Sequence, residues 1–378
     1  MPGRRSGSLV YVAFKEIRRS LGRFTLLSLA VALLVILLLF FQAVAGTLTS
    51  GLTGGLESSS ADVLVYDVRA RLNPANSLIP APVLTQVSES PDVAAVSPIG
   101  LSVFTGTTDG DEIDVQLVGG DPTGPSVPAE IADGRLPQGP GEGLFSGSGF
   151  DNPIEIGQTV SVEGIDFEVV GTADDAAFNL LPTLYVTFED FTSASQNRAG
   201  IPIEVAPSLL GVIVVDGADP AEVAEQLTQS IVGIEALERP AAVDALPGVG
   251  QITQSFNILY VLLYIVVAIV TGVFFLILTV QKQDALVLLR AIGASSRDVV
   301  TSVLIQVLVV VGAGAVIGTV VTAGLLQLTR DVFGASLDST TTTLSVVAIV
   351  VLGLLASVGA VRRVLAIDPM QATRSGAI

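Results

Sequence analysis

Four long runs of apolar residues interrupt this chain, and between the first two runs polar and apolar residues alternate. The first run holds 22 residues and the second holds 23, and neither contains a charged side chain. About 20 consecutive apolar residues are needed to span the hydrocarbon core of a bilayer. The pattern therefore predicts four transmembrane helices, at residues 24–46, 256–280, 299–328 and 344–361.

Basic residues beside these runs predict the direction of each helix. Because Lys and Arg concentrate on the cytoplasmic side of membrane proteins, we expect residues 1–23, 281–298 and 362–378 to be cytoplasmic. Residues 47–255 and a short loop at 329–343 are then extracytoplasmic. The basic residues of the three segments expected to be cytoplasmic are Arg4, Arg5, Lys15, Arg18, Arg19 and Arg23, then Lys282, Arg290 and Arg297, and finally Arg362, Arg363 and Arg374.

The N-terminal segment has a pattern of its own. Val10, Phe14, Ile17 and Leu21 recur at helical spacing among basic residues, which predicts an amphipathic helix on the inner membrane surface. The alternative is a signal peptide cleaved after residues 43–45, Ala-Val-Ala. Signal peptides have shorter apolar cores, of about 7–15 residues. The length of the first run therefore favours a retained transmembrane helix.

Residues 47–255 contain short stretches that alternate with the period of two typical of strands. Glu163 and Gly164 separate two of these stretches and predict a hairpin turn. Pro and Gly are dense from Gly119 to Pro153, where we expect irregular structure. The predicted strands lie at 61–68, 100–107, 112–119, 159–173, 183–188 and 210–216.

Helices are also predicted within residues 47–255. Asp219 followed by Pro220 is typical of a helix start, and the helix should run to about Val232. A further helix or linker covers residues 240–255. The expected fold is an α-helical membrane protein with four transmembrane helices and an extracytoplasmic α+β domain inserted between helices 1 and 2.

Composition excludes several kinds of chemistry. The chain has no Cys and no His, so the thiolate nucleophile, the commonest general base and the commonest transition-metal ligands are missing. Its two lysines, Lys15 and Lys282, do not follow a Gly, so no Walker A loop is present. We therefore expect no catalytic site, no metal site and no ATP hydrolysis by the chain itself.

The acidic charge of the chain lies in the predicted extracytoplasmic domain. Residues 46–257 hold 30 acidic and five basic residues, a net charge of −25, whereas the remainder carries +7 and the whole chain −18. This charge disfavours nucleic acid and anionic lipid as ligands of the domain. Scattered acids favour a role in solubility over a cation site. Glu163, Asp166 and Glu168 are close in sequence, but the alternation places them at a hairpin or on a solvated face.

The segment from Gln281 to Val300 has the pattern of a short amphipathic helix. Four apolar residues share one helical face, Gly293 is a natural helix end, and Ser295 or Ser296 can cap the next helix. The helix would rest on lipid or dock on a cytoplasmic partner. The apolar residues are Ala285, Leu288, Leu289 and Ile292.

Three parts of the chain resemble FtsX/MacB-type ABC transporter permeases. Residues 288–295, LLRAIGAS, are similar to the family signature that follows the second transmembrane helix, and residues 362–374 are similar to its closing element. In that element, Gln371 and Thr373 stand where Glu and Leu are common. Residues 145–188 resemble the family's extracytoplasmic domain, and the order of one helix, a large domain and three helices matches as well.

The resemblance implies a permease subunit that pairs with a second permease copy and with two ABC ATPase subunits. ATP and Mg would be bound by the ATPase, with no cofactor on this chain. Gly314 and Gly318 would allow close helix contact, either between two copies or within one. The predicted coupling helix would dock on the ATPase through Asp284, Leu288, Leu289, Arg290, Ala291, Ile292 and Gly293.

Residues 52–80 look most like the small exporter-type members, the HrtB haem-efflux and DevC-like permeases. Their cargo would enter between the first and second transmembrane helices. A haem-like cargo would need an axial ligand, and only Tyr260 and Tyr264, one turn apart near the outer surface, are placed to supply one. The alternative is that both are interfacial tyrosines of the kind common in transmembrane helices.

Three functions remain open at this stage. The first is efflux of a lipophilic or amphiphilic compound, driven by a separate ATPase. The second is FtsX-like mechanotransmission to an extracytoplasmic partner without transport, and the third is a membrane-anchored sensor. In each case we expect a multi-pass protein in the cytoplasmic membrane of a prokaryote, in contact with lipid and without nucleic acid.

Overall fold

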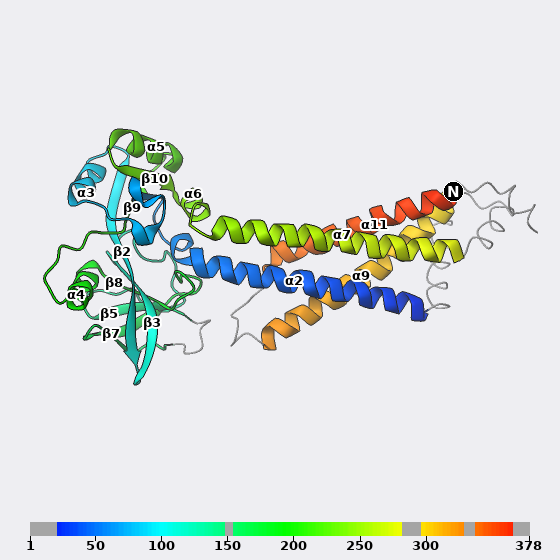
Figure 1. Ribbon diagram of the computed structural model, residues 1–378, viewed down its shortest axis with the longest axis horizontal. Coiled ribbons are helices and arrows are strands. Elements are labelled where there is room, and N and C mark those ends of the chain that lie inside the picture. The colour runs from blue at the N-terminus through cyan, green and yellow to red at the C-terminus, as the bar shows by residue number, and fades with distance from the viewer. Residues whose placement is uncertain (1–20, 148–153, 282–295, 329–336, 366–378) are drawn as a thin grey trace, which may run out of the picture. The chain divides into compact units, whose positions relative to one another are not determined.

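The computed structural model describes residues 21–147, 154–281, 296–328 and 337–365 (Figure 1). These residues form two compact units, which are described separately here. The membrane unit takes in the described residues within Met1–Val44, Ser255–Thr329 and Ala335–Ile378, and the inserted domain those within Ala45–Gln254. Most of the predicted inner-surface helix and of the C-terminal tail lies outside the described residues.

Four long apolar helices make up the described part of the membrane unit. Each includes a stretch long and apolar enough to cross a membrane. Helices α2 and α7 continue past the predicted membrane spans, so α2 reaches Glu57 and α7 begins at Val249. The helices are α2 (Leu21–Glu57), α7 (Val249–Gln281), α9 (Ser296–Leu328) and α11 (Ser339–Leu365).

Buried aliphatic and aromatic side chains hold the four helices together. Val31 and Val35 of α2, Val267 of α7, Val311 of α9 and Ile349 of α11 are almost completely buried in one cluster. The opposite faces carry exposed Leu, Ile and Val side chains. Such faces suit contact with lipid, because a bilayer solvates apolar side chains and the helices satisfy their own backbone groups.

The inserted domain is built on one ten-stranded sheet. Its order is β10-β1-β9-β2-β3-β8-β5-β7-β4, and β6 pairs with β2 and β7. Most neighbours are antiparallel, but β3–β8 and β5–β7 are parallel. The strands are β1 (Val63–Asp67), β2 (Val93–Thr108), β3 (Asp111–Gly120), β4 (Asp133–Gly134), β5 (Glu142–Ser146), β6 (Thr159–Val162), β7 (Ile165–Thr172), β8 (Thr183–Thr187), β9 (Leu209–Val214) and β10 (Ile234–Glu238).

Strand β2 divides the domain into two lobes. Its first half, to Ile99, pairs with β9 in a first lobe with β1 and β10. From Gly100 onward it pairs with β3 in a second lobe with the remaining strands. The first lobe packs on α3 (Ala81–Ser88) and α5 (Pro220–Ser230), and the second on α4 (Phe188–Ala199) (Figure 1). Short elements η1 (Val68–Ala70), η2 (Pro74–Asn76) and α6 (Arg239–Asp244) complete the domain.

The structure confirms most of the strands expected from alternation. Strands β6 and β7 form the predicted hairpin, with Glu163 and Gly164 at positive φ in the turn. Helix α5 begins after Asp219, whose side chain caps it as predicted. The expectation of irregular structure from 119 to 153 was wrong at the short strand β4 and at β5, which lies between β8 and β7 in the sheet.

Candidate functional site

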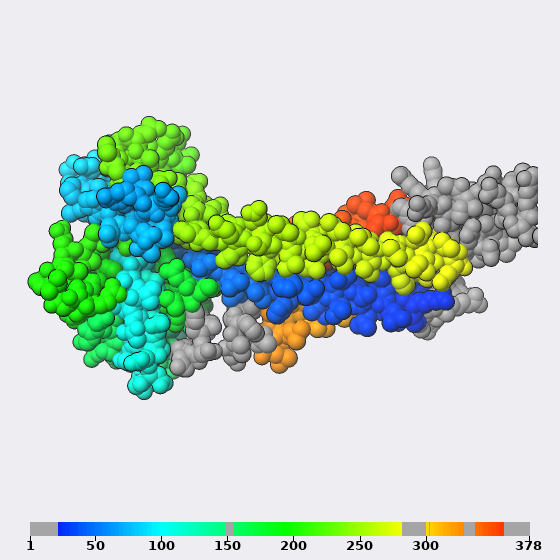
Figure 2. Space-filling view, in the orientation of Figure 1, coloured from blue at the N-terminus to red at the C-terminus, as the bar shows by residue number. Residues whose placement is uncertain are grey.

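Helices α2 and α7 run antiparallel and contact each other near both ends of the bundle. The Tyr260 hydroxyl donates a hydrogen bond of 3.3 Å to the carbonyl of Phe41. Toward the other end, Arg23 donates a hydrogen bond to the side chain of Gln281. Figure 2 shows the two helices in contact along the bundle, α2 in blue and α7 in yellow-green. These two helices are the ones between which the resemblance places cargo entry.

The structure describes only part of the predicted site. Tyr260 is partly buried, packs against the core of the bundle and tilts against the ring of Phe256 at 6.0 Å. Tyr264 is also partly buried against this core. Their role as ligand-facing residues stays a prediction. The predicted docking residues, Asp284, Leu288, Leu289, Arg290, Ala291, Ile292 and Gly293, lie outside the described residues.

The glycines of the third transmembrane helix pack within this chain. A Cβ on Gly318 would lie 2.7 Å from Cβ of Val35, and one on Gly314 would lie 2.7 Å from the carbonyl oxygen of Ser28. The Ser28 hydroxyl also donates to the carbonyl of Val310 at 3.1 Å. The sequence left open whether these glycines contact a second copy or pack within one subunit. The contact between α9 and α2 matches packing within one subunit.

A polar pair links α2 to α11 inside the bundle. The Gln42 amide nitrogen donates to the Ser345 hydroxyl at 2.8 Å, and the Gln42 amide oxygen accepts from the same hydroxyl at 3.1 Å. The two bonds use different hydrogens, because the amide nitrogen donates its own hydrogen and the hydroxyl donates its hydrogen to the amide oxygen. Polar side chains at this depth are favourable when they pair across helices.

Three glycines near the C-terminal end of α2 let a loop of the inserted domain approach the helix backbone. Gly51, Gly54 and Gly55 lie on one helical face, because residues three and four apart are neighbours. Side chains on Gly51 and Gly55 would overlap Leu180 and the ring of Phe178 respectively. We call residues 175–181 the clasp loop. All of these residues belong to the inserted domain.

Backbone hydrogen bonds join the clasp loop to α2. The Gly55 N–H donates to the carbonyl of Ala177 at 2.9 Å, and the Leu180 N–H donates to the carbonyl of Gly51 at 2.7 Å. In a regular α-helix, the Gly55 N–H and the Gly51 carbonyl would pair with each other. Here the loop engages both groups. The end of α2 is therefore bonded into the domain and does not merely rest on it.

The body of the second lobe supports the clasp loop. Tyr185 of β8 is buried, and its hydroxyl donates to the carbonyl of Ala176 at 2.6 Å. Burial raises the pKa of the Tyr185 phenol above its usual value, so the donor stays protonated. The Phe178 N–H donates to the Thr183 hydroxyl at 2.9 Å. The loop is therefore connected to α2 on one side and to the sheet on the other by hydrogen bonds.

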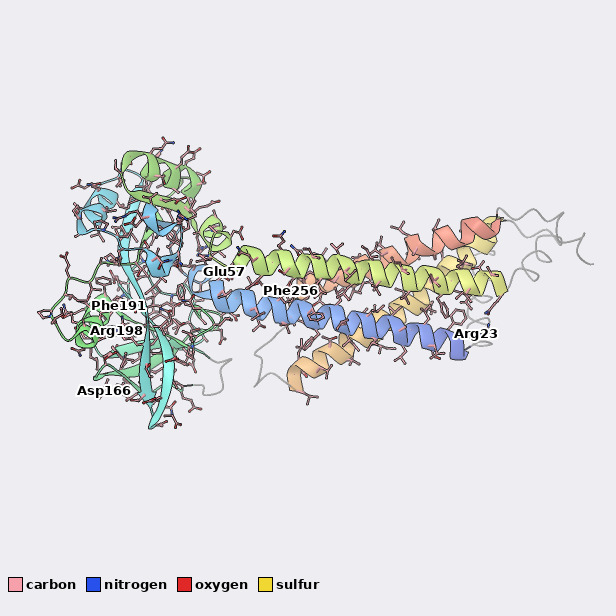
Figure 3. The ribbon with its side chains drawn as sticks, in the orientation of Figure 1. Arg23, Glu57, Asp166, Phe191, Arg198 and Phe256 are labelled. Carbon is pink, nitrogen blue, oxygen red and sulfur yellow. The ribbon has the colours of Figure 1, made fainter. Side chains whose placement is uncertain are left out.

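The acidic side chains of strand β7 lie on its exposed face. Asp166 (labelled in Figure 3) and Glu168 are exposed and alternate with buried Phe167 and Val169, as the alternation predicts. Among the described residues, no three metal-ligating side chains converge. Arg198 lies 4.1 Å from the ring centre of Phe104 and ties α4 to β2.

Sequence reasoning missed the clasp. A signal was present, because residues 51–55 read Gly-Leu-Thr-Gly-Gly immediately after the first apolar run. Three glycines within two turns weaken a helix by about 1 kcal/mol each relative to Ala. A helix that continues through them indicates a close contact on that face. The partner in the contact, the clasp loop, has no recognisable pattern of its own.

The described residues form four apolar helices, and a large α+β domain is inserted between the first two. This is the architecture of a multi-pass membrane protein of the ABC transporter permease class. The family models agree. Residues 24–230 match the MacB-like periplasmic core domain, and residues 257–369 match the FtsX-like permease C-terminal region. The chain belongs to this FtsX/MacB-type family of ABC transporter permeases.

Relatives place the chain among permease components. An ABC transporter permease of Mycobacterium tuberculosis strain H37Rv is 27% identical over 292 residues, which are 76% of this chain and 77% of the relative. A putative hemin transport system permease, HrtB of Staphylococcus haemolyticus, is 21% identical over 64% of this chain and 66% of its own length. The periplasmic region of MacB from Actinobacillus actinomycetemcomitans matches with a TM-score of 0.37 and 13% identity, over 49% of this chain and 92% of that structure.

Proposed function

We propose that this chain is the membrane-spanning, non-catalytic subunit of an ABC exporter. ATP hydrolysis on two separate ATPase subunits drives efflux of a lipophilic or amphiphilic compound from the membrane or its outer leaflet. Two copies of the chain form the transmembrane part. Both termini face the cytoplasm of a prokaryote, and the inserted domain lies outside.

The observation that carries this proposal is the path of α2. One helix, Leu21–Glu57, contains the first transmembrane span and ends in the inserted domain, where the clasp loop bonds to Gly51 and Gly55. In the proposal, α2 is the connection through which motion driven by the ATPase reaches the inserted domain.

The docking site for the ATPase lies between α7 and α9. Helix α7 ends at Gln281, which bonds to Arg23 at the start of α2, and α9 begins at Ser296. The intervening residues include Asp284 and the segment 288–293, which form the amphipathic coupling helix of the proposal. Its apolar face and Arg290 press on the ATPase and pass nucleotide-driven closure to α2 and α7.

The cargo class follows from the surroundings of α2 and α7. Their exposed faces are apolar, so a compound that reaches them is lipophilic or amphiphilic. The HrtB relative is a putative hemin transport system permease, which makes a haem-like compound one candidate. In this chain Tyr260 already donates to Phe41, so it would have to leave that bond to become an axial ligand. We therefore propose an amphiphile as the class, with haem as one member to test.

A second function is favoured by the same clasp. If the inserted domain moves with α2, it can drive an extracytoplasmic partner such as a cell-wall hydrolase, with no compound crossing the membrane. Capture of such a partner by the complex, combined with unchanged accumulation of lipophilic compounds in cells lacking the chain, would support mechanotransmission over efflux. A membrane-anchored sensor would instead need no ATPase at all.

Co-purification with the ATPase encoded beside this chain tests the proposal. We expect the wild-type chain in nanodiscs to retain the ATPase, and the double variant Leu289→Asp with Arg290→Glu to lose it while staying monodisperse. The variant Gln283→Glu, in the same segment but outside the docking residues, should retain the ATPase. Failure of the wild-type chain to bind any ATPase would overturn the proposal and favour the sensor.

A further inference from the structure

A cleft of about 370 Å³ opens within the inserted domain where its two lobes meet. One wall is the middle of β2, at Leu101 and Val103, immediately after the strand changes partner from β9 to β3. Leu52 of α2, Phe178 of the clasp loop and Leu246, which lies just ahead of α7, provide further apolar surface. This volume falls in the range of about 300–1,000 Å³ that is common for small-molecule sites.

A small set of neutral polar groups shares the cleft. Gln116 lies directly opposite Val103 on β3 and is only 2% exposed. Its amide oxygen accepts a hydrogen bond of 3.0 Å from the side chain of Asn179. The amide nitrogen of Gln116 contacts the carbonyl of Leu117 at 3.5 Å, the outer limit for a hydrogen bond. A ligand acceptor could therefore improve the hydrogen bonding of this buried amide.

The cleft differs from its domain in charge. The domain carries a net charge of −25, yet none of the described residues that line the cleft is Asp, Glu, Lys or Arg. A charged ligand would lose hydration there without gaining an ion pair, which is costly in a partly buried site. Apolar walls with a few amide and hydroxyl groups suit an uncharged ligand.

We propose that this cleft binds a small uncharged amphiphile. Its apolar part contacts Leu52, Leu101 and Val103, and its hydrogen-bonding groups meet the Gln116–Asn179 pair. As a statement of cargo class, the inference rests on the proposed efflux function. The ligand also touches Leu52 of α2 and Leu246, which both belong to the inserted domain.

The absence of Cys from the chain makes a direct test available. Val103 is 43% exposed in the cleft, and Val232 is 97% exposed elsewhere in the domain. The full-length variants Val103→Cys and Val232→Cys in nanodiscs each carry one thiol, whose maleimide labelling rate reports local access. The probe is octyl glucoside below its micelle-forming concentration, and octyl sulfate is the charged control with the same alkyl chain.

We expect octyl glucoside to slow maleimide labelling of Val103→Cys about fivefold when its concentration is several times its Kd for the cleft. By mass action, only about a fifth of the clefts are then free. Labelling at Val232→Cys should not change, and octyl sulfate should not protect Val103→Cys. Adding Gln116→Leu to Val103→Cys should reduce the protection. If Val103→Cys fails to fold, Ala75→Cys, exposed on another wall of the cleft, replaces it as the reporter.

Four results would overturn the inference. They are no protection at either cleft thiol, equal slowing at Val232→Cys, equal protection by octyl sulfate, and cleft thiols that never react, because a cleft closed to maleimide is not open to a ligand. The measurement omits the ATPase. If the cleft thiol is protected but the chain binds no ATPase, the ligand site is supported and the proposed function is overturned. If the chain binds the ATPase but the thiol is not protected, the proposed function is supported and the ligand site is overturned.

Discussion

The backbone N–H of Leu180 donates a 2.7 Å hydrogen bond to the carbonyl of Gly51, and this bond joins the clasp loop to the end of α2. Leu180 adopts a positive φ of 58° to make it, and Asn179 before it has a φ of 55°. Such conformations are uncommon for residues other than Gly and are kept where the surroundings require them. The strained backbone indicates that the clasp is a specific contact.

Substituting Gly55 by Ala should loosen the clasp. The new methyl group would overlap the buried ring of Phe178, and overpacking of this kind typically costs about 1–3 kcal/mol. We expect a clear fall in the apparent Tm of the inserted domain, measured by circular dichroism. Gly46→Ala is the matched control, because Gly46 lies in the same helix with no atom near its Cβ position. Equal Tm values for the two variants would contradict the account of the clasp.

The packing of α9 on α2 predicts a second effect. In Gly318→Leu the added side chain would clash with Val35, so we expect aggregation or a lower apparent Tm in detergent. Gly324→Leu should behave like the wild type, because Gly324 has open space at its Cβ position. If Gly318→Leu instead stays folded and only dissociates a dimer, the glycines serve contact between copies, and the packing described here is not their main role.

The Gln42–Ser345 pair should be energetically coupled. Loss of either side chain leaves the other polar group without this partner in an apolar bundle. We expect the double variant Gln42→Leu with Ser345→Ala to cost less than the sum of the singles, by about 0.6–1.7 kcal/mol. Unfolding in mixed micelles of lipid and sodium dodecyl sulfate measures the four free energies. Strict additivity would show that the pair contributes nothing.

Some elements of this fold could be predicted from the sequence and others could not. The hairpin of β6 and β7 was predictable because Glu163 and Gly164 mark its turn, and α5 because Asp219 and Pro220 mark its start. Strand β5 was missed because its five residues lie among glycines and prolines, where local composition favours irregular structure. Only pairing with β8 and β7 makes it a strand, and pairing between distant segments has no local signal.

The candidate site was less predictable than the fold. The motif at 288–295 and the paired tyrosines could be found in the sequence, because each is a local pattern. The clasp and the cleft could not, because Gly55, Phe178, Gln116 and Leu246 are far apart in the chain. Their proximity depends on how the two lobes close around the end of α2, which is a property of the tertiary structure.

A surface ion pair provides a prediction about pH. The Glu142 carboxylate accepts hydrogen bonds from Arg135 at 2.6 and 2.7 Å and from the Gln138 N–H at 2.8 Å. These contacts, chiefly the Arg135 hydrogen bond, lower the pKa of Glu142 to about 2. A lowered pKa in the folded state means that the stabilisation is present above the ordinary pKa and is lost as pH falls toward 2.

Glu142→Gln should therefore lower the apparent Tm at pH 7, and the difference from the wild type should shrink between about pH 4.5 and 2. The effect should be small, because exposed ion pairs contribute little and are screened by salt. Glu204→Gln, at an exposed position in the loop after α4, serves as the control and should show no such trend. A difference that grows as pH falls would contradict the assigned sign.

Hydrogen–deuterium exchange tests the central claim, that this chain docks an ATPase at 281–298 and passes its motion through α2 to the inserted domain. The chain would be compared alone, with the ATPase, and with the ATPase trapped by vanadate. We predict that peptides over 282–295 become protected when the ATPase binds, while peptides over 51–57 and 175–181 stay protected in all three states because the clasp remains closed. An unchanged 282–295 segment, or a clasp that opens in the trapped state, would contradict the account.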